Sequence, residues 1–259
     1  MIKKIRLDNE PTTLKIVVAT GKSQKIWLKV ADPSKKNTYY IKRFANVKGK
    51  KSFFVNIPIS PQVDDVIVYN ASNGLNERDR SFKVLKIKRL PLQVKPLMKL
   101  SKKTKSFVRF AEEFCQSAGY IPSSVNGEVY RSNNGKFRID YFDVIRSKGD
   151  KSKISTPARI SQLTGKIEVS AKAFRKYTIP MRMAILMHEF AHFYLNEVPS
   201  DESEADINGI KVYLTMGYPK ISAYNVFLNV FKRSPSMQNK NRYDKLDSFI
   251  KEYRERENE

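Results

Sequence analysis

Cysteine and histidine are almost absent from this chain, which has 1 Cys and 2 His among 259 residues. A single cysteine excludes an internal disulfide and a metal site built from several thiolates. Cys115 lies in "FVRFAEEFCQSAG", where apolar residues recur at helical spacing. We therefore expect it to be a small buried side chain rather than a reactive thiol.

Long apolar runs are also absent. No stretch of about eighteen apolar residues occurs, and the first ten residues, "MIKKIRLDNE", lack the apolar core of a signal peptide. We therefore expect a protein without a membrane span that is made in the cytoplasm. The hydrophobic share of 41% supports ordinary globular cores, and the length suits one large domain or two modest ones.

Acidic residues are scarce in the first hundred positions, which hold 22 Lys and Arg against 7 Asp and Glu. Such an excess favours binding to polyanions, including nonspecific binding of nucleic acid. A solvated lysine face on a sheet explains the same pattern, because "SFKVLKIKRL" alternates lysine with apolar residues. We expect residues 1–95 to contact a protein assembly partner, with nonspecific nucleic-acid binding as the alternative.

The chain changes character near residue 95. Before it, short alternating or β-branched runs predict about six strands, at 12–20, 24–31, 38–47, 52–60, 65–72 and 81–90. Turn-rich pieces such as "DPSKKN", "VKGKK" and "ASNGLNERD" separate them. This spacing is typical of a small antiparallel sandwich or barrel. The two prolines of "RLPLQVKPLMKL" then indicate a linker, so residues 1–95 are expected to be an accessory β domain and 96–259 a second domain.

The second domain is expected to be mostly helical with a small sheet, which makes the whole chain α+β. Apolar residues at helical spacing predict a helix from about Phe107 to Ala118, stopped by Gly119. Strands are expected in "GEVYRS", "GKFRIDYFDVI", "ARISQL" and "GKIEVSA". From Met181 a helix follows that is apolar on nearly every side, which indicates burial.

Both histidines lie in that buried helix, four residues apart, in "HEFAH". Side chains four apart on a helix are neighbours, so the imidazoles of His188 and His192 can reach one metal ion. Glu189 is rotated off their line and is suited to handle a metal-bound water. A pair of hydrogen-bonded core histidines is the alternative. The only two histidines would fall four apart in roughly 1% of random orderings, which favours the metal.

The acidic segment "SDESEAD" can supply a third ligand, with an acidic helix start favoured by the helix dipole as the alternative. Asp201 is expected to cap a second helix, with Glu204 as its capping-box partner and Gly217 and Pro219 near its end. Glu202 then lies on the first turn and can complete a zinc shell that leaves one position for water. Asp206 lies one turn later and can accept the outer N–H of a ligating imidazole. Ala205 is small enough to let the two helices approach closely.

"HEFAH" followed by "ESEADINGIKVYLTMGYP" resembles the zincin metallopeptidases of the gluzincin type. It is most similar to the CAAX prenyl endopeptidase and heat-shock membrane protease family. The resemblance covers roughly residues 100–235 and implies zinc ligands His188, His192 and Glu202, a catalytic base Glu189 and an outer partner Asp206. That family is usually membrane-embedded, which this chain does not match. The interval between His192 and Glu202 is also short, which keeps Asp201 and Glu197 as alternative ligands.

These residues predict hydrolysis of a peptide or protein substrate by a metal-activated water, with Glu189 as general base. Without a third histidine, the oxyanion needs another donor. The candidates are Tyr213, Tyr218, Tyr224 and Arg182. "GKIEVSA" resembles the edge strand along which zincins align an extended substrate, although an ordinary sheet strand explains it equally.

Two classes of function remain. The first is a zinc endopeptidase with an accessory β domain. The second is a structural or adaptor protein that keeps a zincin-like fold and uses its basic β domain for assembly contacts. The lysine- and asparagine-rich composition resembles that of bacteriophage-encoded proteins, so a virion component is the natural form of the second class. Host cytoplasm or virion would then be the location.

Overall fold

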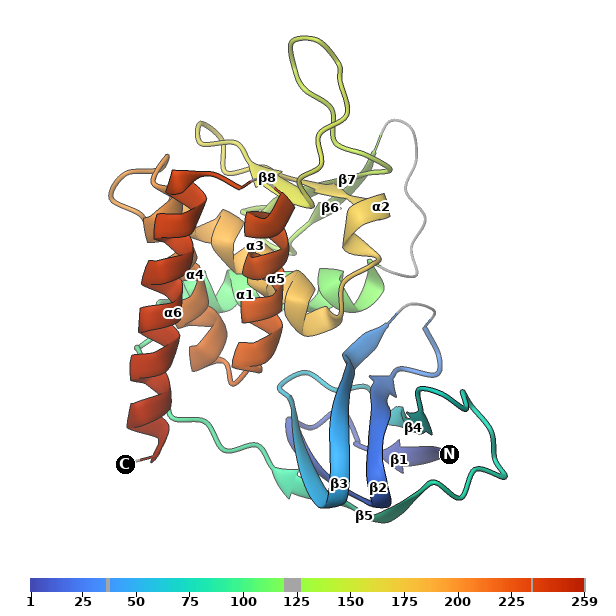
Figure 1. Ribbon diagram of the computed structural model, residues 1–259. Coiled ribbons are helices and arrows are strands. Elements are labelled where there is room, and N and C mark those ends of the chain that lie inside the picture. The colour runs from blue at the N-terminus through green and yellow to red at the C-terminus, as the bar shows by residue number, and fades with distance from the viewer. Residues whose placement is uncertain (36–37, 119–126, 234, 259) are drawn as a thin grey trace. The chain divides into compact units, whose positions relative to one another are not determined.

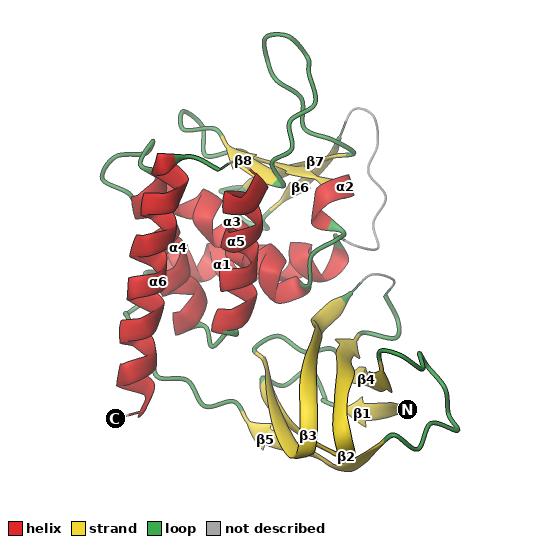
Figure 2. Cartoon of the chain, in the orientation of Figure 1, coloured by secondary structure: helices red, strands yellow, loops and turns green. Residues whose placement is uncertain are grey.

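The chain forms two compact units, Met1–Val94 and Lys95–Glu259, which we call the N-terminal and C-terminal units. The computed structural model describes residues 1–35, 38–118, 127–233 and 235–258. The first unit is built on an antiparallel sheet, and helices dominate the second, so the chain is a mixture of helices and strands (Figure 2). The unit boundary lies one residue from the one expected from the sequence.

Five antiparallel strands form the N-terminal sheet. They are β1 (Ile2–Arg6), β2 (Thr12–Ala31), β3 (Tyr39–Ile57), β4 (Val63–Asn70) and β5 (Phe82–Pro91) (Figure 1). The order is β1-β4-β2-β3, and β5 also pairs with β2. The first half of β2 pairs with β5 and the second half with β4, while β3 follows β2 along both halves. The β2–β3 hairpin therefore runs along the whole sheet of this unit.

The strand count differs from the expectation. The four runs expected at 12–20, 24–31, 38–47 and 52–60 are halves of two long strands, and "VKGKK" lies within β3 rather than in a turn. The register shifts between Thr20 and Gln24, and Gly49 opposite Thr20 has a φ of 69°. A bulge with glycine in the left-handed region bends a ladder without ending it. The hydroxyl of Thr20 donates to the Val47 carbonyl across the bend at 2.9 Å. Strand β1 was not predicted.

One buried carboxyl group in the N-terminal core makes no hydrogen bond to the described residues. Asp64 lies with Val66 and Val68 on the inner face of β4, and it is fully buried. Neither of its carboxylate oxygens has a hydrogen-bond partner in the described part of the chain. Burial raises the pKa of Asp64 to about 8, and the charges of Asp32 and Asp65 add to the effect. A neutral carboxyl is thus the stable form of this side chain in the folded unit.

The C-terminal unit contains a four-stranded mixed sheet of β6 (Glu128–Arg131), β7 (Arg138–Phe142), β8 (Ala158–Ile160) and β9 (Ile167–Ser170). The order is β6-β7-β9-β8, and only β7 and β9 are parallel. Of the two interpretations of "GKIEVSA", the structure supports the ordinary sheet strand, because this segment forms β9, which pairs with both β7 and β8. The strands at the two edges of the sheet are β6 and β8.

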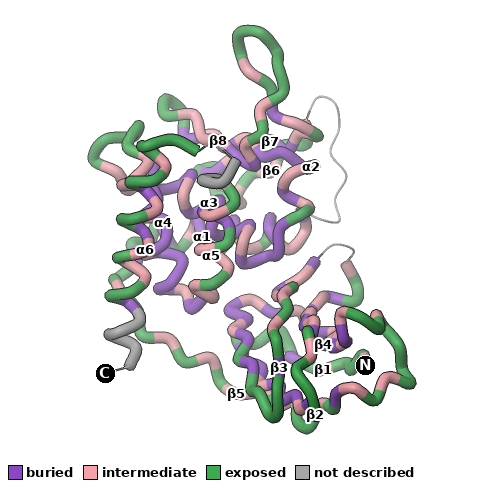
Figure 3. Tube along the Cα trace, in the orientation of Figure 1, coloured by how far each residue is buried: buried purple, intermediate pink, exposed green. Residues whose placement is uncertain are grey.

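Six helices complete the C-terminal unit, and α3 lies among them. They are α1 (Lys102–Ser117), α2 (Ala171–Phe174), α3 (Ile179–Tyr194), α4 (Glu202–Thr215), α5 (Lys220–Arg233) and α6 (Met237–Asn258). Helix α3 packs against α1, α4, α5 and β8, and most of its residues are buried, as expected (Figure 3). The stacked rings of Phe107 and Phe190, 4.3 Å apart, join α1 to α3.

Helix α1 begins where its sequence provides a cap. The hydroxyl of Ser101 accepts a hydrogen bond from the Thr104 N–H, and the helix ends at Ser117. Gly119, the expected stop, lies outside the described residues. Cys115 is fully buried on α1, and burial raises the pKa of its thiol, so it is a packing residue as expected. Among the described residues, no helix is both long and apolar enough to cross a membrane.

Candidate metal centre

Helix α3 places both imidazoles on one side of the helix, a single turn apart. The Nε2 atoms of His188 and His192 lie 3.1 Å from each other. His192 is 5 % exposed, and the side chain of His188 is 14 % exposed. Two imidazole nitrogens this close, and shielded from bulk water, need either a shared proton or a cation between them.

The short loop after α3 brings a carboxylate to the histidines. Asp201 caps α4 by accepting a hydrogen bond from the Glu204 N–H at 2.9 Å, as expected. The Glu204 carboxylate binds the backbone N–H groups of Glu197 and Val198 in the loop, rather than returning to Asp201. This bonding fixes the loop and places Glu202 on the first turn, with its carboxylate 3.4 Å from His188 Nε2 and 3.6 Å from His192 Nε2.

Helices α3 and α4 cross in direct backbone contact. A Cβ atom at Gly209 would lie 2.8 Å from the His188 nitrogen and 2.9 Å from its Cα. Ala205, the small residue expected at this crossing, is fully buried one turn earlier. Because Gly209 has no side chain, α4 can approach the backbone of α3 this closely at the level of His188.

The donor groups have spacings close to those around a tetrahedral metal. Ligands at about 2.0–2.2 Å from zinc lie about 3.3–3.6 Å from one another in a tetrahedral shell. The two Nε2 atoms are 3.1 Å apart, one oxygen of Glu202 lies 3.4 Å from His188 Nε2, and its other oxygen lies 3.6 Å from His192 Nε2. These three are the group of potential metal ligands found within the described part of the chain. Imidazole and carboxylate donors in this arrangement suit zinc.

Each histidine directs its other nitrogen to an oxygen. The Nδ1 of His192 lies 2.7 Å from the Pro199 carbonyl, to which it can only donate. The Nδ1 of His188 lies 2.9 Å from an oxygen of Asp206, although this contact is off the line of a good hydrogen bond. Both contacts favour a proton on Nδ1, which leaves Nε2 for a metal. Asp206 thus lies where the sequence placed an outer partner.

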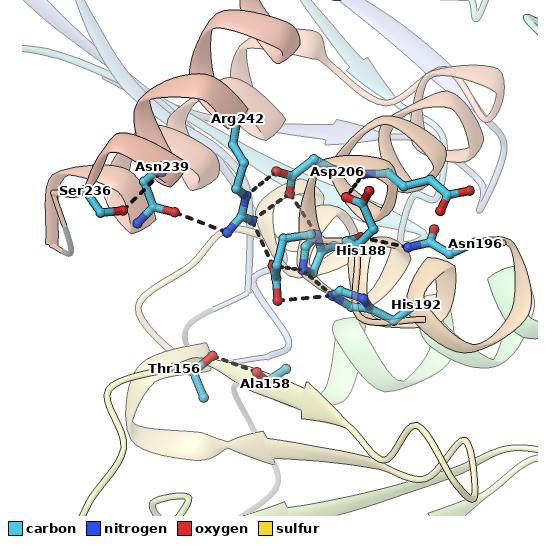
Figure 4. Close-up of polar contacts among 12 residues, drawn as sticks. Thr156, Ala158, His188, His192, Asn196, Asp206, Ser236, Asn239 and Arg242 are labelled. Carbon is cyan, nitrogen blue, oxygen red and sulfur yellow. Dashed lines mark hydrogen bonds and ion pairs between the residues drawn. The ribbon is translucent and has the colours of Figure 1, made fainter. Parts of the chain in front are cut away.

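Arg242 on α6 joins the centre, and sequence reasoning missed it. Its guanidinium binds both oxygens of Asp206, at 2.7 and 3.0 Å, and an oxygen of Glu202 at 3.0 Å (Figure 4). Asp206 is 1 % exposed, so this bidentate pair is largely removed from water. No sequence signal distinguished Arg242 from the other basic residues of its helix, because only the packing of α6 against α4 reveals the contact.

The charges of the cluster set the pKa values of the two histidines. Burial by itself would lower the pKa of His188, but the carboxylates of Asp206 and Glu202 outweigh it and raise that pKa to about 10. Burial and the charge of His188 lower the pKa of His192. In the absence of metal, one proton therefore resides on His188 Nε2, facing the lone pair of His192.

The pKa values of Glu202 and Glu189 shift in opposite directions. Burial opposes ionisation of Glu202, but His188 and Arg242 outweigh it and lower the pKa of Glu202 to about 2. Burial raises the pKa of Glu189 to about 7, and the nearby charge of Glu202 adds to this, while His188 and the Ile160 N–H oppose it. Glu202 is thus a permanent anion suited to a cation, and Glu189 can gain and lose a proton near neutral pH.

A cavity of about 240 Å³ opens over these groups. Its walls come from the β8 segment, α3, α5 and α6, with Glu202 at the start of α4. The lining residues are Thr156, Pro157, Ala158, Arg159, Ile160, Gln162, Ile185, His188, Glu189, His192, Glu202, Val226, Phe227 and Arg242. The side chain of Glu202 is 39 % exposed, so solvent reaches the ligand group through this cavity.

The four candidate oxyanion donors do not line the cavity. Arg182 is fully buried on the first turn of α3 and donates to the carbonyls of Phe174 and Cys115. The tyrosine hydroxyls are engaged elsewhere. Tyr213 donates to the Pro219 carbonyl, Tyr218 to Glu112, and Tyr224 bonds Tyr243. These side chains are near the histidines in sequence, but their polar groups are bonded to partners outside the cavity.

The alternative ligands also lie outside the donor group. Asp201 uses its carboxylate to cap α4, and Glu197 is exposed in the loop before it. Comparison with known proteins adds no assignment: no family model matches the chain, and neither a curated protein nor a solved structure matches it significantly. The geometry of the centre therefore carries the functional argument.

Proposed function

We propose that this protein is a zinc-dependent metalloendopeptidase with a zincin-like C-terminal unit. The observation that carries the proposal is the set of separations among His188, His192 and Glu202, which suits a tetrahedral zinc with one position left for water. The resemblance of "HEFAH" and "ESEAD" to gluzincins agrees with it. Zinc at this position would polarise the scissile carbonyl and acidify a bound water.

Glu189 is the proposed proton carrier. It lines the cavity beside both histidines without belonging to the ligand group, and burial holds its pKa at about 7. A carboxylate with this pKa can accept the proton of the attacking water and deliver it to the leaving nitrogen. Because the base must be ionised, hydrolysis should rise with pH as Glu189 titrates. A zinc ion nearby would lower the midpoint below 7.

Strand β8 is the proposed guide for the substrate backbone. Pro157 accepts from Ser170, and Ser161 donates to Lys166, so these residues direct their backbone groups to β9. In an antiparallel ladder alternate residues direct their backbone groups to opposite sides, so those of Ala158 and Ile160 point away from β9. Both residues line the cavity, where the Ala158 carbonyl accepts from the Thr156 hydroxyl and the Ile160 N–H faces Glu189. An extended peptide that exchanges its own groups for these contacts can add there as a further strand. The proposed substrate is thus an extended segment of protein, and the basic N-terminal unit is the proposed site for partner contacts.

The test is substitution of the base without loss of the metal. Glu189→Gln should retain zinc and the fold but lower the rate of peptide hydrolysis by about 10²–10⁴-fold, because an amide cannot accept the proton. Glu197→Gln is the matched control, since it removes a nearby exposed carboxylate and should leave both properties unchanged. Zinc is measured by elemental analysis, and hydrolysis by cleavage of quenched peptide libraries and unfolded protein.

The outcomes separate the two functional classes. Equal hydrolysis by Glu189→Gln and the parent would remove Glu189 from the mechanism. Loss of zinc from Glu197→Gln would contradict the ligand assignment. If the parent holds zinc but cleaves none of the substrates, the peptidase proposal fails, and a structural role in an assembly such as a virion gains support.

A further inference from the structure

Three aromatic side chains form a row on the outer face of the N-terminal sheet. Trp27 on β2 is the direct cross-strand neighbour of Phe44 on β3 and of Tyr69 on β4. The ring of Trp27 stacks on Tyr69, with centroids 6.3 Å apart, and meets Phe44 edge-on at 5.3 Å. We call Tyr69, Trp27 and Phe44 the ring row.

The ring row faces solvent rather than the core. In β2 the buried residues Ile26 and Leu28 alternate with Trp27, so the row lies on the opposite face of the sheet from the core. Phe44 is 51 % exposed, and Trp27 and Tyr69 are half-buried. Cross-strand rings stabilise a sheet, but large apolar side chains that reach solvent as a contiguous group more often mark a binding surface.

Lysines surround and cover the rings. The Nζ of Lys25 lies 4.0 Å from the centre of the Phe44 ring, and that of Lys29 lies 4.9 Å from the Tyr69 ring. Lys29 and Lys42 are direct cross-strand neighbours, which costs stability because like charges face each other. Asp65 is the acidic residue of β4 on this face, and Lys4 already pairs with it at 3.2 Å. The face therefore carries excess positive charge between its rings.

We propose that the ring row binds single-stranded nucleic acid. Stacked rings on a platform offer flat apolar faces to unstacked bases, and the lysines between them can move to the phosphates. A duplex keeps its bases stacked on one another and offers only its backbone, so the rings would contribute nothing to its binding. The carboxylates of an acidic protein would pair with the lysines but would make no use of the faces of three adjacent rings. The surface thus matches the combined chemistry of bases and phosphates.

The chain carries its own reporter for this surface, because Trp27 is its only tryptophan. Titration of the full-length protein with oligo(dT) or oligo(U) should quench or shift the Trp27 fluorescence as bases stack on the row. A duplex of the same length and polyglutamate serve as controls for charge. Oligonucleotide binding without a change in Trp27 fluorescence would overturn the proposal, as would equal responses to the duplex or polyglutamate. Comparison of dT with U separates DNA from RNA as the preferred strand.

Substitution of the rings gives a second test with a close control. Phe44→Ala and Tyr69→Ala should each weaken oligo(dT) binding by about 5-fold or more, because stacking contributes roughly that much or more per base. Phe54→Ala is the matched control. Phe54 is 54 % exposed and lies under Lys15, but the residues aligned with it, Lys15 on β2 and Lys88 on β5, are not aromatic. Equal effects of Phe44→Ala and Phe54→Ala would contradict the ring row, and unfolding in urea followed by Trp27 fluorescence verifies that each variant is folded.

The lysines are tested by the salt dependence of binding. Each lysine–phosphate contact to a single strand contributes about −0.7 to the slope of log affinity against log salt concentration. The double variant Lys25→Gln, Lys29→Gln should make that slope shallower by up to about 1.4 while oligo(dT) still quenches Trp27. An unchanged slope would show that these lysines do not meet the phosphates and would contradict the proposed orientation of the strand.

Discussion

One carboxylate in each unit shows how its surroundings decide the direction of a pKa shift. In the C-terminal unit, the half-buried Glu202 faces His188 and Arg242, and its pKa falls to about 2. In the N-terminal unit, Asp64 is buried without a hydrogen-bond partner among the described residues, and its pKa rises to about 8. Burial acts on both, and the cations that face Glu202 reverse the sign of its shift. Such a carboxylate indicates a site when cations surround it, and a cost to stability when they do not.

The two units also differ in where their candidate sites lie. In the C-terminal unit the metal-binding side chains line a cavity, and they lie on helices whose crossing is fixed by backbone contact. The N-terminal unit places lysines and rings on an open sheet face and leaves apolar side chains in its core. Precise geometry is needed to bind a metal ion, whereas a flat charged face suits a polymer that can adapt to it.

The largest effect should come from removing a donor from the C-terminal cluster. His188→Ala should lower zinc affinity by more than the roughly 10–100-fold typical of losing an outer partner. Asp206→Asn, which removes such a partner, should fall within that range. Competition with a chromogenic chelator measures both. Equal zinc affinity of His188→Ala and the parent would show that the cluster is not a metal centre.

The same cluster should bind zinc more tightly as pH rises. The proton on His188 must leave before a metal binds, and the pKa of this group is raised to about 10 in the metal-free protein. Between neutral pH and 10, the apparent affinity should therefore increase about tenfold per pH unit. Calorimetry in buffers with different ionisation enthalpies should detect about one proton released per zinc near pH 7. Release of no proton would contradict the assignment of this proton.

The second largest effect should be a pH dependence of the stability of the N-terminal unit that is caused by Asp64. Because its folded pKa lies above the unfolded value of 3.8, the folded unit retains a proton that the unfolded chain loses between pH 4 and 8. The free energy of unfolding therefore falls as pH rises through that window, by on the order of 4 kcal/mol between pH 4 and 7. Asp64→Asn removes this loss of stability. The free energy of unfolding of the variant should therefore exceed that of the parent by an amount that grows with pH.

Urea unfolding followed by the fluorescence of Trp27 measures this effect in the N-terminal unit. Asp65→Asn is the control, because Asp65 is the adjacent residue and pairs with Lys4 on the outer face. The advantage of the control over the parent should grow much less with pH, because it removes only the contribution of Asp65 to the raised pKa of Asp64. A constant difference between Asp64→Asn and the parent across the window would show that Asp64 does not carry a proton in the folded state.

The smallest effect should come from adding one methyl group at the helix crossing. Gly209→Ala places a Cβ within 3 Å of the His188 backbone, so α4 must shift, at a cost of about 1–3 kcal/mol. Since Glu202 moves with α4, zinc affinity should fall as well. Gly149→Ala is the control, because nothing lies within 4 Å of a Cβ there. Unchanged zinc affinity in Gly209→Ala would show that the crossing does not position the ligand.

Local signals predicted the part of the centre that lies within a few turns of chain. The spacing of His188 and His192 is a property of one helix, and the Asp201 cap fixes Glu202 and Asp206 on the next. Arg242, 36 residues beyond Asp206, depends on how α6 packs, which no periodicity in its own helix indicates. The edge position of β8 depends on which strands pair, and the continuity of β2 and β3 depends on a bulge. Neither can be deduced from alternation alone.

The pairing of the only two imidazoles across 3.1 Å makes the centre spectroscopically isolated. Every histidine side-chain resonance in a nuclear magnetic resonance spectrum of this chain must come from the centre, because no other histidine contributes background. The nitrogen shifts of these rings distinguish a protonated, a neutral and a metal-bound imidazole. When this chain alone carries labelled histidine, the state of the centre can thus be followed within mixtures or assemblies, where activity and metal content are averaged over every protein present.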